Sequence, residues 1–168
     1  MAKHLLFLIH GIGVHEPEWG EELDGPIKTL QKVSEQYAYF QKPGQALSEK
    51  VEFIPIHYDE VFKEIISQWQ QDAAAIDQWD VNGMLHGGLT WLATASDQKV
   101  WWSHIADLAM YRFFPIYRQR VRSHVILQLA QRIEQAMNTE GSATCSVLAH
   151  SMGTAVAHDC LHLLGTVT

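Results

Sequence analysis

The pattern of hydrophobic residues along the chain predicts strands that alternate with helices. Leu5–Ile9 is apolar at every position, which is typical of a central parallel strand covered by helices on both faces. From Pro26, apolar residues recur at helical spacing up to Lys42 and predict a first crossover helix. Val51–Ile56 predicts a second strand, and Pro55 places it at the sheet edge because proline lacks the amide proton that a central strand donates.

A long helical insertion is expected between the second and the third strand. Helical spacing continues to about Gln71 and then dissolves, so we interpret residues 60–114 as an insertion or lid, rich in tryptophan. After Pro115 a longer helix is predicted, with apolar residues four positions apart up to Met137. Thr144–Ala149 then predicts a third strand, and a last helix follows it. The elements together indicate an α/β protein with a short parallel sheet flanked by helices.

Length and composition narrow the classes of protein that fit. At 168 residues and 47% hydrophobic, residues 1–168 are expected to form a single domain. The net charge is -7 and the basic residues are scattered, so we expect no nucleic-acid-binding surface. No apolar run approaches the length of a membrane span, and the two cysteines indicate no disulfide framework, so we expect a cytoplasmic protein. Cys145 falls in a strand expected to be covered and Cys160 in a packed helix.

The first motif with chemical meaning lies between the third strand and the last helix. Ala149, His150, Ser151, Met152 and Gly153 form a nucleophile elbow, G-x-S-x-G, with alanine in the first glycine position. A sharp strand-to-helix turn at this place pushes the serine hydroxyl out of the sheet. The residues two before and two after the serine must be small because neighbouring backbone passes close to them.

The second motif directly follows the first strand. His10, Gly11, Ile12 and Gly13 make a glycine-rich turn, as in loops that bring backbone amides close to a reacting oxygen. Either motif alone is a weak signal. Two motifs in their proper strand contexts indicate an active site that uses a serine nucleophile.

The two motifs resemble those of α/β-hydrolases, and of small Bacillus-type lipases in particular, which also have alanine in the elbow. The resemblance covers the motifs and their strand contexts, and it implies the N-terminal portion of an α/β-hydrolase fold. It also implies a cofactor-free serine hydrolase for ester or related acyl bonds, with Ser151 as nucleophile. The backbone amides of Ile12 and Met152 would then form the oxyanion hole. The insertion departs from those lipases, so their specificity is not implied.

Simpler readings exist for several of these residues. His10 and His150 are interpreted as shaping their turns by hydrogen-bonding their own backbone, rather than as catalytic groups. Ser151 could instead be an ordinary turn serine that caps an amide of the next helix. His158 and His162 share one helix face, but no third ligand is near them in sequence, so no metal site is predicted.

The base and the acid that a serine nucleophile needs are missing from the expected places. In this fold they follow the serine, but only His158, Asp159 and His162 do so here, on a helix that runs away from the hydroxyl. His57 and Asp59, after the second strand, are the alternative within the chain, although Asp59 fits a helix cap better. We therefore expect an incomplete hydrolase domain, inactive by itself.

The expected partners follow from this interpretation. The substrate is a small-molecule or lipid-like acyl compound, and the tryptophans of the insertion would form an apolar mouth for it or contact residues that are missing. The third strand should present a bare apolar edge, which we expect to pair with a second copy in a homodimer or with a missing C-terminal half of the hydrolase. A non-catalytic interaction module on the same scaffold is the alternative function.

Overall fold

The computed structural model of the chain describes residues 3–11, 19–22, 25–64, 67–68, 71, 111–112 and 115–166. The chain divides into two compact units. The first consists of Met1–Gly11, His15–His57 and Arg122–Thr168, and the second of Ile12–Val14 and Tyr58–Val121. The sheet and the described residues of both motifs belong to the first unit.

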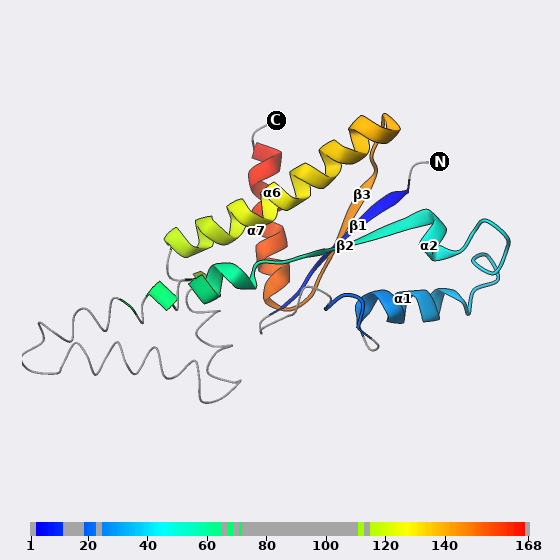
Figure 1. Cartoon of the computed structure of the whole chain (residues 1–168), viewed down its shortest axis with the longest axis horizontal. Helices are drawn as coiled ribbons and strands as arrows, with labels where there is room; N and C mark the ends of the chain where they lie inside the picture. Colours follow the sequence, from blue (N-terminus) through cyan, green and yellow to red (C-terminus); the bar gives the residue numbers. More distant parts are fainter. Residues whose placement is uncertain are drawn as a thin grey trace, which may run out of the picture. The chain divides into compact units, whose positions relative to one another are not determined.

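Among the described residues, three parallel strands form the sheet of the first unit (Figure 1). They are β1 (His4–Ile9), β2 (Val51–Ile56) and β3 (Cys145–Ala149), in the order β2-β1-β3. The predicted central place of the first strand and the predicted edge place of the second are both confirmed. The chain therefore has an α/β architecture with an open parallel sheet.

Strand β1 is buried on both faces because its side chains alternate between two covered sides. Phe7 and Leu8 point to opposite faces of the sheet, and each is only 1% exposed. Pro55 of β2 lies in register with Leu8. Since β2 pairs only with β1 among the described strands, the missing amide proton of Pro55 is tolerated at this edge.

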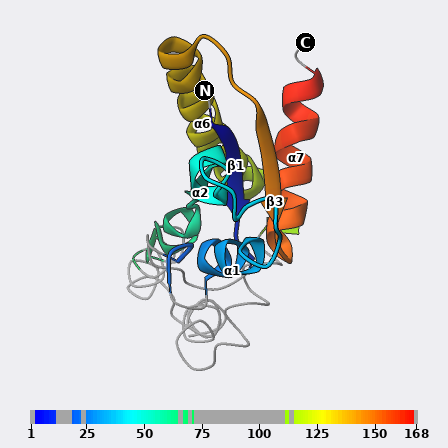
Figure 2. The ribbon, with the colours of Figure 1, turned by 90° about the vertical axis from the view of Figure 1, so that its right-hand side faces the viewer.

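Helices cover the two faces of the sheet unequally (Figure 2). The helices α1 (Pro26–Ser34) and α2 (Leu47–Lys50) connect β1 to β2, and α6 (Pro115–Glu140) precedes β3. Helix α7 (Met152–Thr166) follows β3 and packs beside α6, where the Cys160 Sγ lies 3.8 Å from a backbone oxygen of α6. Helix α1 therefore lies on one face of the sheet, and α6 and α7 lie on the opposite face (Figure 2).

Helix α1 ends earlier than the sequence predicts, at Ser34 rather than near Lys42. The Ser34 hydroxyl donates to the Gln31 carbonyl at 2.6 Å and so competes with helical hydrogen bonding at this end. Beyond it, Tyr37 is 60% exposed and lies in a series of turns. Tyr37 continues the helical spacing of apolar residues, but its side chain does not pack into the described core.

Helix α6 ends where the sequence predicts, although its buried stripe changes position along the helix. Val125 and Leu129 are buried, but Met137, two steps of four residues beyond Leu129, is 48% exposed. Steps of four residues overshoot the 3.6-residue turn, so a stripe built on them rotates away from the core. Ala136 takes over the buried face. Gly141, with a φ of 74°, ends the helix.

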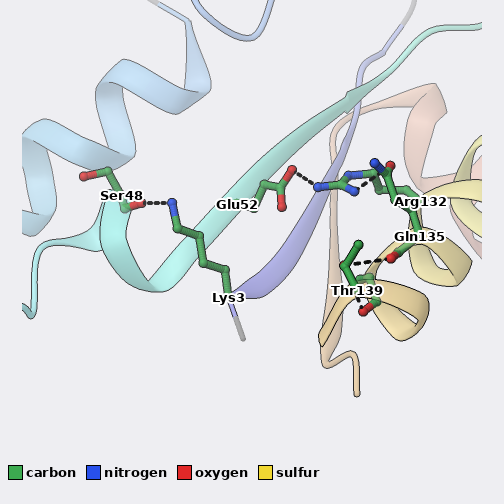
Figure 3. A network of polar contacts seen from close by, with 7 residues as sticks. Lys3, Ser48, Glu52, Arg132, Gln135 and Thr139 are labelled. Carbon is green, nitrogen blue, oxygen red and sulfur yellow. Dashed lines mark hydrogen bonds and ion pairs between the residues drawn. The ribbon is translucent and has the colours of Figure 1, made fainter. Parts of the chain in front are cut away.

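Polar contacts hold the N-terminal edge of the sheet to its flanking helices (Figure 3). Arg132 of α6 forms an ion pair with Glu52 of β2 and also donates to Gln135 at 2.8 Å. Lys3 donates from its Nζ to the Ser48 carbonyl of α2 at 2.9 Å. Both ionic groups of the Arg132–Glu52 pair are partly exposed, so we assign the pair at most about 1 kcal/mol of stability.

The two cysteines differ in a way that corrects one sequence expectation. Cys160 is buried, as predicted, but Cys145 is exposed because β3 lies at the sheet edge. Burial, with the Asp159 carboxylate beside it, raises the pKa of the Cys160 thiol to about 11. Within the described ranges, no helix combines the length and apolar character needed to cross a membrane.

Alkylation with iodoacetamide at pH 8 should therefore modify Cys145 and spare Cys160. The thiolate is the reacting form, and a thiol with a pKa of about 11 is ionised to about one part in a thousand at this pH. Peptide mass spectrometry locates the label, and Cys145→Ser serves as a control that gains label only after denaturation. Equal modification of both thiols in the folded chain would contradict the described burial.

Candidate functional site

The turn between β3 and α7 bends sharply at Ser151. Ser151 has a φ of 54° and is the one residue other than glycine with a positive φ in the described part of the chain. The amide of His150 still donates to the Ile9 carbonyl at 3.1 Å, so the ladder to β1 continues up to the bend. A residue with a Cβ is strained in this region of backbone conformation. The predicted kink at position 151 is confirmed.

The Ser151 side chain does not cap the helix that it precedes. The amides of Gly153 and Thr154 donate to the carbonyl oxygens of His150 and Ser151, at 2.9 and 3.0 Å. The exposed Ser151 hydroxyl forms no hydrogen bond with any described residue. The turn-serine alternative requires this hydroxyl to accept from one of those amides, so the geometry disfavours it.

The glycines of the two motifs are required by close approach. A Cβ added to Gly153 would overlap the His10 carbonyl oxygen and lie 2.6 Å from that of Ile9. A Cβ added to Gly11 would lie 2.8 Å from the Ser151 Cβ. The two glycine-bearing turns are therefore adjacent, as the sequence interpretation requires. Ile12 and Gly13 lie outside the described residues.

Helix α7 begins with an amide that is available at the turn. Met152 is its first residue, and its backbone N–H has no acceptor among the described residues, as is usual for the first turn of a helix. The Met152 side chain is 5% exposed and packs inward, so only its backbone can face a ligand. A free amide directly after the nucleophile is what an oxyanion hole needs.

The two motif histidines have different environments. His10 is buried and its Nδ1 lies 2.9 Å from the Gly11 carbonyl, which agrees with its predicted role in shaping the turn. Its ring meets that of Trp19 edge to face, with 5.3 Å between the ring centres. His150 is exposed, and no bond from its ring to the described backbone is found, so the same prediction is not met for His150.

The candidate bases His158 and His57 do not lie beside Ser151. His158 lies seven positions along α7, about 10 Å at the helical rise, and its 79% exposed side chain stacks on His162. His57 follows β2, which β1 separates from β3, and its backbone is held by the Gln128 side chain at 2.6 and 3.2 Å. Asp59 is buried and is the first helical position after β2, rather than a residue preceding the helix.

The connectivity of the sheet places this turn where parallel sheets bind ligands. The connection from β1 to β2 passes over the α1 face, and the connection from β2 to β3 passes over the α6 face. The carboxyl ends of β1 and β3 therefore lie on either side of a topological switch point, where a crevice forms between diverging connections. Gly11 follows one of these strands and Ser151 the other.

A cavity of about 400 Å³ opens beside the turn, on the α1 side of the sheet. It is lined by the last residues of β1 and β3 and by Trp19 and Pro26. The sequence did not indicate a role for Trp19, since its place depends on how the turn before α1 folds back. Among the described residues, no group of three or more potential metal ligands lies together.

Comparison of the chain with protein-family models, with curated proteins and with solved structures found no match.

The insertion expected at residues 60–114, with its tryptophans, lies mostly outside the described residues. Its described positions at 60–64, 67–68, 71 and 111–112 are helical.

If Ser151 is held in a strained conformation, Ser151→Gly should be more stable than Ser151→Ala. Glycine adopts a φ near 54° without a Cβ penalty, whereas alanine retains it. We expect a difference of about 1 kcal/mol in the free energy of unfolding, measured by urea denaturation. Alanine equal to or better than glycine would show that the backbone at this position is relaxed.

A matched pair of glycine variants in α7 tests the contact between its first turn and β1. Gly153→Ala should lower the free energy of unfolding by about 2 kcal/mol or more, because the new methyl group would meet backbone atoms rather than a flexible side chain. Gly165→Ala should stabilise the chain by about 0.5 kcal/mol, because nothing lies within 4 Å of its added Cβ. Urea denaturation measures both, and similar effects at the two positions would rule out the close approach.

Proposed function

We propose that the chain carries the nucleophile half of an α/β-hydrolase-type serine hydrolase that cleaves ester or related acyl bonds. The observation that carries the proposal is the bend at Ser151, with a φ of 54°, at the end of a parallel strand and against Gly11. A positive φ at a serine between a parallel strand and a helix is the geometry of a nucleophile elbow. The helical insertion at residues 60–114 belongs to the same proposal.

The proposed reaction is acyl transfer through Ser151. Its Oγ attacks the carbonyl carbon, the hydroxyl proton passes to a base, and the carbonyl oxygen becomes an oxyanion. The amides of Met152 and Ile12 stabilise that oxyanion, Met152 from the start of α7 and Ile12 from the glycine-rich turn. The bond to the leaving group then breaks as that group takes up the proton, and water releases the acyl group from Ser151.

The base is the part of the reaction that the described residues do not supply. Among the described residues, no hydrogen bond joins the Ser151 hydroxyl to a histidine or a carboxylate. We propose that the acid and the histidine come from a C-terminal half or from a partner. With the nucleophile and the oxyanion hole alone, we expect the reaction to be only roughly 10³-fold faster than in water, so that this chain by itself is close to inactive as an enzyme.

A non-catalytic interaction module is the second candidate. It is favoured by the absence of a hydrogen bond between the Ser151 hydroxyl and any described base, and by the exposed edge strand β3. The two candidates differ in one measurable property, the reactivity of Ser151 toward an electrophile. A scaffold without catalytic function does not require a strained and unbonded hydroxyl at the carboxyl end of its sheet.

A fluorophosphonate probe is expected to label Ser151 slowly but selectively. Attack by the Oγ on phosphorus displaces fluoride and leaves a phosphonyl serine that peptide mass spectrometry can locate. Ser151→Ala should remove the label. Ser146→Ala is the matched control, because Ser146 is exposed on the same strand and its hydroxyl lies 2.9 Å from the His4 Nε2. Label on Ser146, or no label above that of a denatured sample, would reject the hydrolase.

A further inference from the structure

The cavity beside Ser151 has no role in the acyl-transfer steps, yet it is continuous with the site. Gly11 and His150 line it and also contact or adjoin Ser151. A Cβ placed on Gly11 would lie 2.8 Å from the Ser151 Cβ and 3.3 Å from the His150 Nδ1. Ser151 is not among the described lining residues, so the cavity adjoins its turn through Gly11 and His150.

The wall of the cavity is mostly apolar. Leu8, Trp19, Pro26 and Leu148 supply apolar side chains, and His10 and His150 line it as well. None of the described lining residues is Asp, Glu, Lys or Arg. Within this described lining, a charged ligand would lose its hydration without gaining a carboxylate, ammonium or guanidinium partner. An uncharged hydrocarbon group gains free energy by leaving water for such a wall.

The wall also contains side chains that are fixed in place. Trp19 stacks edge to face on the buried His10 ring. Its turn is tied to α1 by hydrogen bonds from the Ile27 amide to the Gly20 carbonyl at 3.1 Å and from the Gly25 amide to the Glu22 carbonyl at 2.9 Å. Binding would order few additional groups, which lowers its entropic cost.

Leu148 leaves apolar surface in water that a ligand can cover. It is 45% exposed at the rim, while Leu8, its register partner on β1, is 1% exposed at the base of the cavity. The volume of about 400 Å³ lies at the lower end of the range for small-molecule sites. It fits a chain of moderate length better than a long lipid tail.

We propose that this cavity binds the acyl chain of the substrate, so that the enzyme acts on esters of medium-length apolar acids. The chain lies against Leu8, Trp19 and Leu148, and its carbonyl group emerges past Gly11 at Ser151. This inference rests on the proposed hydrolase function for the identity of the ligand as a substrate. The existence of the apolar site depends on the cavity alone.

Binding is tested on the Ser151→Ala protein, in which no acyl transfer to position 151 takes place. A terminally brominated octanoate is titrated while tryptophan fluorescence is recorded, since bromine quenches an indole that it contacts. We expect saturable quenching that Trp19→Phe abolishes. Brominated acetate, which has the carboxylate without the chain, should quench only weakly and without saturation.

Two leucines of similar exposure provide the matched variants. Leu148→Asp places a charge in the wall and should weaken binding at least about tenfold. Leu161→Asp changes an α7 residue that is 49% exposed and does not line the cavity, so the affinity should stay the same. Circular dichroism checks that both variants are folded.

The outcomes separate the cavity from the hydrolase. If quenching persists in Trp19→Phe, or if Leu148→Asp and Leu161→Asp change the affinity equally, the ligand does not bind in this cavity. Fluorophosphonate labelling without saturable quenching leaves the hydrolase and rejects this acyl site. If quenching is saturable but the fluorophosphonate does not label Ser151, the apolar binding site stands, but its ligand is not the acyl chain of a substrate.

Discussion

The first turn of α7 rests directly on the carbonyl groups that end β1, and the geometry of the site depends on this contact. Only glycine at position 153 allows it, because any Cβ would collide with backbone that cannot move aside. To reach this position from β3, the chain must turn within one residue. Ser151 takes the left-handed conformation that makes the turn, and its strain is tolerated because packing and the β1 ladder hold both sides.

Uneven coverage of the sheet explains the other features of the site. β1 lies between two strands and is covered by helices, whereas β3 has one neighbour among the described strands. Leu148 and Cys145 are therefore exposed, although their sequence context resembles that of a buried strand. The apolar cavity lies along this open side. Pairing of β3 with a second copy or with a further part of the fold remains a prediction that follows from the same asymmetry.

Elements with a local physical cause were predictable from the sequence. Pro55 identified an edge strand because a missing amide proton is a property of the residue itself. Gly141 marked the end of α6 because it reaches a positive φ without cost. The end of α1 and the exposure of Met137 were not predictable, since spacing shows which side chains share a face but not whether a core covers that face.

At the site, the order of the residues alone was enough to place Ser151 between a strand and a helix, with small residues at the flanking positions where backbone must pass. Three other features required the folded chain: Gly11 lies against Ser151, Trp19 stacks on His10, and a mostly apolar cavity adjoins the turn. The reason is that a turn is encoded by neighbouring residues. A contact between distant segments depends on the register of β1 with β3 and on where the connecting helices pack.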